Sequence, residues 1–215
     1  MELLWRGAVV CRVGGMTGEG PRIRPLGACE SGEQQRVGAW RVHRSRPVYD
    51  GSPWLRVDMV DVTAPNADRF EHAAIWVPDA AVALIVDEQR QAVLMLRRQR
   101  WVIGRDGYEL LGGLVDDGED PADTARREAF EESGHAPRGE SEHLLTVHPM
   151  PGLVDSAMHV YLWREGAEQV AEPSDPHEAG TVEWVPLARV DELADGGQLL
   201  GATTAVALYR YVARR

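Results

Sequence analysis

The chain has 215 residues, of which 44% are hydrophobic and 27% charged, and its formal net charge is −11. This length suits one domain with an appended piece and excludes two domains of ordinary size. The negative charge argues against partners such as nucleic acid or an anionic membrane surface. All cationic side chains are arginines, because the sequence contains no lysine.

The N-terminal part of the chain gives no sign of export or membrane insertion. Its first residues place an acidic residue and an arginine around a short apolar stretch, unlike a signal peptide, and no apolar run is long enough to cross a membrane. The two cysteines, Cys11 and Cys29, match no common zinc spacing. We therefore expect a cytoplasmic protein.

Three regions are predicted along the chain. Residues 1–38 are rich in glycine, proline and polar residues, which favours an irregular or flexible extension. Residues 39–78 contain alternating segments separated by DGSP and APNAD turns, which indicates an antiparallel β subdomain. In one of these segments Leu55, Val57 and Met59 alternate with charged residues and should share one face.

Two aromatic residues, Tyr49 and Trp54, flank the first of these turns. Large aromatic side chains usually pack in a core, which is the simpler interpretation. The alternative is that they form a stacking platform for a purine base.

Residues 79–215 form the main predicted domain. The apolar run AAVALIVD is typical of a buried strand, and QAVLMLRRQRW returns as its partner. Further strands follow a central helix, and the chain ends in two helices, the last with Ala205, Leu208, Tyr209 and Val212 on one face. The order of elements predicts a mixed α/β sandwich with an N-terminal antiparallel β extension.

The central helix is predicted at residues 121–133. Asp120 can cap its first turn, and Pro121 suits the first helical position, where no N–H is needed. Gly134 can adopt the positive φ that commonly ends a helix.

Three glutamates of this helix, Glu128, Glu131 and Glu132, are spaced to lie on one face. One interpretation is a solvated acidic surface. The other is a site for a hard divalent cation such as Mg²⁺, which prefers oxygen ligands. The glycine-rich turn before the helix and the arginine beside the acids favour the metal site.

Seven residues between the glycine turn and the end of this helix follow a pattern that resembles the signature of the Nudix hydrolases. These residues are Gly113, Glu119, Arg127, Glu128, Glu131, Glu132 and Gly134. Two apolar positions of the family pattern differ, with Ala129 small and His135 polar.

The resemblance implies a Nudix-type fold, a mixed sheet between helices with the glycine turn and acidic helix at its mouth. It also implies roles for the matched residues. Glu128, Glu131, Glu132 and the carbonyl group of Gly112 would hold Mg²⁺, or Mn²⁺, which accepts similar ligands. Glu119 and Arg127 would pair and brace the turn against the helix, as Gly113 and Gly134 would shape its two ends.

Features outside the signature resemble the ADP-ribose pyrophosphatase branch of the family. YELLGG places Glu109 where that branch has an acidic residue, although Leu111 replaces its usual proline. RRQR resembles its arginine-bearing strand, which makes Arg97 and Arg100 candidate phosphate ligands. Pro151 matches its marker proline. Glu178 matches a loop glutamate that would act as catalytic base, with Glu172 and Asp175 as competitors.

The leading hypothesis is a Mg²⁺-dependent hydrolase that cleaves ADP-ribose or a related nucleoside diphosphate sugar into a nucleoside monophosphate and a sugar phosphate. Alternatives within the family are NADH, a GDP-sugar or a dinucleoside polyphosphate as substrate. A different class is a nucleotide-sugar sensor without catalysis. The resemblance also implies a homodimer that exchanges N-terminal strands, with a small-molecule nucleotide as the binding partner.

Overall fold

The computed structural model describes residues 35–174 and 180–214. The predicted extension at residues 1–38 therefore lies almost entirely outside the described residues, and so does Glu178. The chain divides into two compact units, Met1–Val77 and Pro78–Arg215. Each unit is described by itself.

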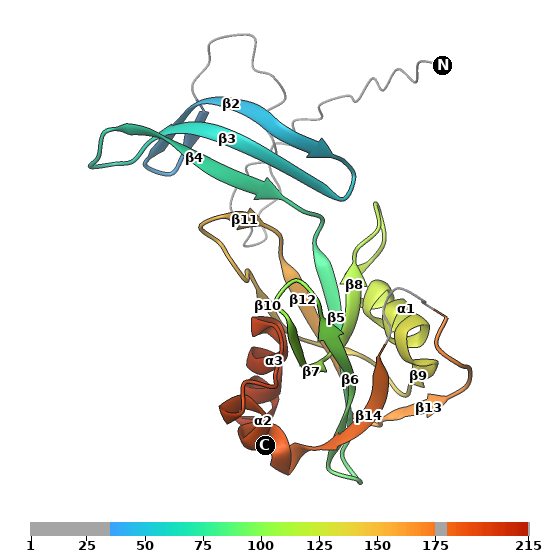
Figure 1. Ribbon diagram of the computed structural model, residues 1–215. Helices are drawn as coiled ribbons and strands as arrows, with labels where there is room; N and C mark the ends of the chain where they lie inside the picture. Colours follow the sequence, from blue (N-terminus) through green and yellow to red (C-terminus); the bar gives the residue numbers. More distant parts are fainter. Residues whose placement is uncertain (1–34, 175–179, 215) are drawn as a thin grey trace, which may run out of the picture. The chain divides into compact units, whose positions relative to one another are not determined.

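In its described part, residues 35–77, the N-terminal unit contains four antiparallel strands, coloured blue to cyan-green in Figure 1. These are β1 (Gln35–Val37), β2 (Trp40–Gly51), β3 (Leu55–Thr63) and β4 (Arg69–Trp76). Each strand pairs with the next along the chain, which confirms the predicted antiparallel strands. The meander follows from the short turns that the sequence places between them.

The buried face of β3 is the one opposite Leu55, Val57 and Met59. Its buried residues are Asp58, Val60 and Val62, whereas the three apolar residues are only half-buried. Asp58 tolerates full burial because Arg56 donates to both of its carboxylate oxygens, at 2.8 and 3.1 Å, and Ser45 donates to one of them at 2.8 Å.

The second unit is built on a mixed sheet in the order β10-β12-β5-β6-β14. The strands are β5 (Ala80–Asp87), β6 (Ala92–Arg100), β10 (Glu142–Val147), β12 (Met158–Trp163) and β14 (Thr181–Pro186). β12 runs parallel to β5, and the other neighbours are antiparallel. Two short strands join this sheet: β7 (Arg105–Glu109) pairs with β6, and β8 (Leu111–Leu114) pairs with β5.

The remaining short elements lie around this sheet. β9 (His135–Pro137) and β13 (Ala167–Gln169) pair with each other, β11 is Val154–Asp155, and a 3₁₀ turn covers Leu187–Arg189.

Helices cover both faces of the mixed sheet. On one face α1 (Pro121–Ser133) buries Ala125 and Ala129 against alternate residues of β5 and β6. On the other face α2 (Val190–Asp195) and α3 (Ala202–Val212) pack Leu193 and Leu208 into a second core. Figure 1 shows α2 and α3 on the opposite side of the strands from α1. The predicted mixed α/β sandwich is confirmed.

Helix α1 has the predicted ends. The Asp120 carboxylate accepts from the Ala122 N–H at 2.8 Å, and Pro121 occupies the first turn. Gly134 has a φ of 69° and its N–H donates to the carbonyl oxygen of Phe130 at 2.7 Å. These capping interactions define where α1 begins and ends, and the glutamates lie in its last two turns.

The buried face of α3 differs from the predicted one. Its buried residues are Thr203, Thr204, Ala207, Leu208 and Tyr211. Tyr209 and Val212 are instead exposed, at 42% and 41%. Apolar residues occur on several sides of this helix, so hydrophobicity alone does not fix which side meets the sheet.

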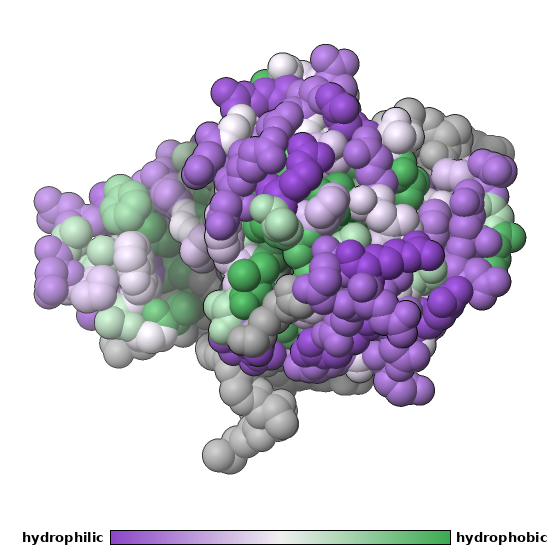
Figure 2. Space-filling model, turned by 90° about the horizontal axis from the view of Figure 1, so that it is seen from below, coloured by the Kyte–Doolittle hydropathy of each residue, from purple (hydrophilic) through white to green (hydrophobic). Residues whose placement is uncertain are grey.

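Figure 2 shows hydrophobic residues in separate groups among hydrophilic ones on one face of the molecule. Within residues 35–174 and 180–214, no helix is both long enough and apolar enough to span a membrane.

Candidate active site

Arg127 is the centre of a group of charged side chains on α1 and the loop before it. We call this group the helix network: Arg127, Glu119, Glu128 and Glu131. Its Nε and Nη2 donate to the two carboxylate oxygens of Glu119, both at 3.0 Å. Its Nη1 donates to Glu128 at 2.7 Å and to Glu131 at 3.0 Å. One guanidinium group therefore joins the loop before α1 to two of the three glutamates on the helix.

The helix network changes the acidity of its members. The hydrogen bonds from Arg127 and then Thr124 lower the pKa of Glu119 to about 2. The pKa of Arg127 is raised, first because of its hydrogen bonds to Glu119. Glu119 is therefore ionised throughout the physiological range, as the pairing with Arg127 requires.

The glycines of β8 leave room for the helix carboxylates. A Cβ atom on Gly113 would lie only 2.6 Å from Oε1 of Glu128, so a larger residue would displace this carboxylate. The N–H of Gly112 donates to Oε2 of Glu132 at 2.7 Å. In an extended strand the N–H and C=O of one residue point to the same side. The Gly112 carbonyl group therefore also faces away from β5.

A second group of charged residues connects the sheet to the helix. We call it the sheet network: Arg98, Arg100, Glu109 and Glu132. Arg98 donates from Nε to Glu109 at 2.7 Å and from Nη1 to Glu132 at 3.1 Å. Arg100 donates to the same Glu109 carboxylate, with Nη2 at 2.7 Å from Oε2. The four side chains alternate in charge and sum to zero.

These four side chains differ in their exposure to solvent. The side chains of Arg98 and Glu132 are 4% and 1% exposed, and that of Glu109 is 14% exposed. Arg100 is 38% exposed. Burial raises the pKa of Glu132 to about 7, although Arg98 and the Gly112 N–H act in the opposite direction.

Arg100 and Glu109, two of the predicted candidates, lie in the sheet network. Arg97, a third candidate, does not. Arg97 donates to Asp106, at 3.0 and 2.8 Å, and lies over the ring of Tyr108. Tyr108 belongs to the core under α2 and α3. Arg97 therefore lies on the opposite face of the sheet from α1.

Arg98 is the site residue that the sequence interpretation missed. Successive residues of a strand point to opposite faces, so Arg97 and Arg100 cannot share a face of a regular strand, whereas Arg98 and Arg100 can. Leu94 and Leu96 pack in the α1-side core, and Arg98 continues their alternation. Strand alternation was the signal that could have identified Arg98.

The donor set fits a hard divalent cation by its chemistry. Glu128, Glu131 and Glu132 come from a little more than one helical turn, and the backbone of Gly112 meets Glu132. Oxygen ligands of this type suit Mg²⁺. Within the described part of the chain, no three acidic, histidine or cysteine side chains yet surround one point as a metal site. Arg127 and Arg98 occupy the carboxylates instead.

Three other predicted site residues are exposed. Pro151 is exposed in a turn whose Leu153 N–H donates to Met150 O at 2.9 Å. Tyr49 and Trp54, in the N-terminal unit, are 56% and 63% exposed. Neither aromatic residue is in the core of its unit, which removes the simpler interpretation of both.

The segment that leads toward Glu178 is tied to the end of α1. The N–H groups of Val170 and Ala171 donate to the carbonyl oxygen of Gly134 at 2.9 and 3.2 Å. The N–H of Ser174 donates to the carbonyl oxygen of Glu131 at 2.8 Å. Of the three candidate bases, Glu172 lies in this segment, whereas Asp175 and Glu178 are outside the described residues.

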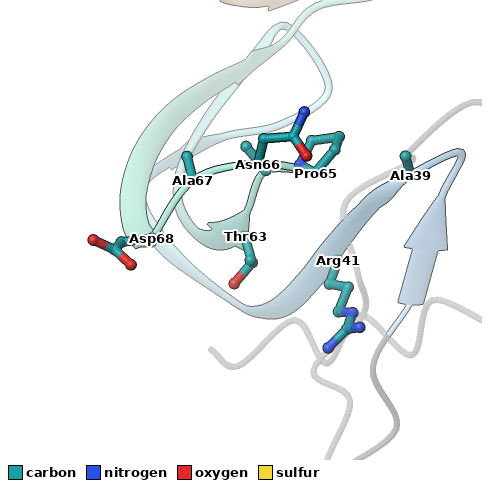
Figure 3. A pocket seen from close by; sticks show the side chains of 8 residues that line it. Ala39, Arg41, Thr63, Pro65, Asn66, Ala67 and Asp68 are labelled. Carbon is teal, nitrogen blue, oxygen red and sulfur yellow. The ribbon is translucent and has the colours of Figure 1, made fainter.

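The N-terminal unit contains a separate hollow of about 470 Å³. It is lined by the β3–β4 turn and β2, and Figure 3 shows Arg41 and Thr63 on one side with Asp68 pointing away. Among the described residues that line the hollow, Asp68 is the only acidic one, and no charged residue is buried. Its residues give no indication of catalysis.

Residues 54–202 match the NUDIX domain family. The chain belongs to the Nudix hydrolase family. It is a Nudix pyrophosphohydrolase, and the match includes the glycine turn, α1 and both charged networks.

Two relatives illustrate the range of activities near this chain. The CMP-5'-(N-acetyl-N-hydroxy-3-aminopropyl)phosphonate hydrolase of Streptomyces rubellomurinus is 44% identical over 169 residues, 79% of this chain and 80% of that protein. The ADP-ribose pyrophosphatase of Bacillus subtilis is 26% identical over 153 residues, 69% of this chain and 80% of that protein.

A solved structure described as an ADP compounds hydrolase has the same fold. It superimposes with a TM-score of 0.70, and the match covers 84% of this chain and 96% of the other at 18% identity.

Proposed function

We propose that this protein hydrolyses the anhydride bond between a nucleoside 5'-phosphate and a second phosphoryl or phosphonyl group, and releases a nucleoside monophosphate. The observation that carries the proposal is that Glu128 and Glu132 meet the glycines of β8, where Glu132 also pairs with Arg98 of the sheet network. Arg127 joins Glu131 to Glu128. Carboxylates can hold a divalent cation, and arginines can bind phosphate oxygens as bidentate donors.

Each residue has a distinct proposed role. Glu128, Glu131, Glu132 and the Gly112 carbonyl group would hold Mg²⁺ or Mn²⁺. The metal, when bound, would neutralise the charge of the diphosphate and lower the pKa of a water ligand. Arg100, which is more than one-third exposed, would bind a phosphate group of the substrate. Glu109 would orient Arg100 through the hydrogen bonds between them.

Glu178 remains our candidate for the base that takes a proton from the attacking water. Its support is the family resemblance and the attachment of residues 170–174 to the last turn of α1, which starts the loop beside the acidic residues. Glu172, which precedes the loop, is the alternative within the described residues.

ADP-ribose and related nucleoside diphosphate sugars form the first substrate class that we propose, supported by the ADP-ribose pyrophosphatase relatives. A second class is CMP linked to a phosphonate. The 44% identity with the Streptomyces hydrolase favours it. Both classes present a phosphate group attached to a nucleoside, which is the part that the arginines would bind.

Hydrolysis of a substrate panel tests the proposal. ADP-ribose, ADP-glucose, GDP-mannose, NADH, a diadenosine polyphosphate and a CMP–phosphonate conjugate are incubated with the full chain in Mg²⁺ or Mn²⁺, and the products are separated by chromatography. Release of AMP fastest from ADP-ribose supports the first class, and release of CMP fastest supports the second. No hydrolysis of any compound would contradict the proposal and favour a nucleotide sensor.

We also propose that the protein is a homodimer in which N-terminal strands are exchanged, because the resemblance to the ADP-ribose pyrophosphatase branch implies it. Exposed Tyr49 and Trp54 would then be available to stack on a base held by the partner subunit. Sedimentation at micromolar concentration measures this directly. A monomer would exclude any such role for the two aromatic residues.

A further inference from the structure

We propose that Arg98 is a positioning residue of this active site, which holds the Glu132 carboxylate ready for the metal and fixes Arg100 for the substrate through Glu109. This inference rests on the proposed metal-dependent function. It assigns a role to a residue outside the family signature, and its basis is the geometry of the sheet network.

The first step in the argument is the burial of the pair. Arg98 and Glu132 are almost completely excluded from solvent, at 4% and 1% side-chain exposure. A carboxylate in such a place needs a countercharge and hydrogen bonds, because water does not solvate it. Arg98 supplies the countercharge at 3.1 Å, and the Gly112 N–H supplies a further hydrogen bond at 2.7 Å.

These two contacts also define the orientation of Glu132. Oε1 accepts from Arg98 and Oε2 accepts from Gly112, so the carboxylate group is held at both oxygens. One of these donors belongs to β6 and the other to β8. The plane of the carboxylate is thus set by two strands before any metal binds, and rotation away from β8 would break a buried hydrogen bond.

The second step is the shared use of Glu109. Arg98 and Arg100 both donate to Oε2 of this carboxylate, each at 2.7 Å. Arg98 thereby contacts two glutamates at once, through different nitrogens of one planar guanidinium group. A lysine has a single charged nitrogen and cannot reproduce this fork. Arg98 therefore links the candidate metal ligand to the candidate phosphate ligand.

The neighbouring arginine provides a matched control. Arg97 is on the same strand and also forms a carboxylate pair, but with Asp106 on the face covered by α2 and α3. It is 47% exposed. Substitution of either arginine removes one positive charge from β6. Of the two, Arg98 contacts Glu132 and Arg97 does not, so a difference between the variants reports on this contact.

The test compares R98Q, R98K, R97Q and E132Q with the natural protein. Mn²⁺ binding is measured without substrate by electron paramagnetic resonance, unfolding is measured on metal-free protein, and kcat and KM are measured on the best substrate of the panel. We expect R98Q to weaken Mn²⁺ binding and lower kcat by about 10–100-fold, as for other residues that orient metal ligands. R98K should recover only part of this loss, and R97Q should bind Mn²⁺ like the natural protein.

Separate outcomes test the two proposals. If the natural protein binds no Mn²⁺, or if E132Q leaves binding unchanged, the proposed metal site is wrong. If the natural protein binds Mn²⁺ and folded R98Q binds it as tightly or more tightly, only the role of Arg98 is wrong. If R98Q does not fold, R98K decides, and affinity equal to that of the natural protein overturns the proposal.

Discussion

The two charged networks differ in how their residues come together. In the helix network Arg127 meets Glu128 and Glu131, one and four residues away, and Glu119, eight residues away. In the sheet network Arg98 meets Glu109 and Glu132 at separations of 11 and 34 residues. Arg127 is 32% exposed, whereas Arg98 is 4% exposed.

This difference shows what each network contributes. The helix network is local and partly solvated, so each of its contacts contributes modestly to stability. The sheet network depends on the packing of β6, β8 and α1, and its Arg98–Glu132 pair is almost completely buried. Loss of one member of this pair leaves a buried charge with fewer partners. Substitutions in the two networks should therefore have different consequences for activity, metal binding and folding.

The largest expected effect is on Glu132, the residue that joins α1 to the sheet network. E132Q should reduce kcat by roughly 100-fold or more, because a metal ligand that contributes several kcal/mol is lost. Steady-state kinetics measures this loss, and urea denaturation of the metal-free protein verifies that the variant is folded.

Glu168 offers a control for this substitution. It is 64% exposed and its nearest arginine, Arg138, is 3.6 Å away. E168Q should leave both kcat and unfolding unchanged. Equal kcat for E132Q and the natural protein would refute the assignment of Glu132 as a metal ligand.

A smaller effect is expected at the exposed end of the sheet network. R100Q should raise KM roughly 10-fold with a much smaller change in kcat, because one charge-assisted hydrogen bond to the substrate is lost. Initial rates over a range of substrate concentrations separate the two constants. A change in Mn²⁺ affinity without any change in KM would show that Arg100 acts on the metal site instead.

In the helix network the expected effect is on stability and depends on pH. The folded pKa of Glu119 is about 2, below its ordinary value of 4.5. Its pairing therefore stabilises the protein above about pH 4.5, and this contribution is lost as the pH falls toward 2. E119Q should lower the free energy of unfolding at pH 7 by about 1–2 kcal/mol, after allowance for partial solvent exposure.

This expectation is tested by denaturation of metal-free protein at several pH values between about 3 and 7. These values lie on both sides of about 4.5, the ordinary pKa of Glu119. The difference between E119Q and the natural protein should shrink as the pH falls. D106N, which breaks the exposed pair with Arg97, serves as the comparison. A difference that is constant with pH would mean that ionisation of Glu119 does not stabilise the fold.

The smallest effect is expected for Arg97. R97Q should change kcat, KM and the free energy of unfolding by little, because its partner Asp106 is 49% exposed and the pair is solvated. A loss of activity comparable to that of R100Q would contradict the placement of Arg97 on the far face of the sheet.

Short-range features were predictable from the sequence, and the sheet network was not. The ends of α1 depend on Asp120, Pro121 and Gly134, which act within one turn of the helix. Arg98 and Glu132 meet only after β6, β8 and α1 have packed, and no local pattern specifies that meeting. The position of Arg97 has a local cause, because residues 97 and 100 of a regular strand point to opposite faces of the sheet.

The buried face of α3 was only partly predictable from the sequence. Leu208 was correctly placed in the core, but Tyr209 and Val212 are exposed. Thr203 and Thr204 are buried instead, and the Thr204 hydroxyl accepts from the Leu110 N–H at 3.3 Å. This polar contact with the segment between β7 and β8 accompanies the buried face, and it is visible only in the folded chain.

The attachment of residues 170–174 to the end of α1 has a practical consequence. The amides of Val170, Ala171 and Ser174 donate to carbonyl groups of Gly134 and Glu131, and this stretch of backbone carries two of the proposed metal ligands. Their hydrogen exchange with deuterated solvent reports how often this end of the helix opens. Occupation of the carboxylates can therefore be followed at three backbone positions that need contact neither metal nor nucleotide.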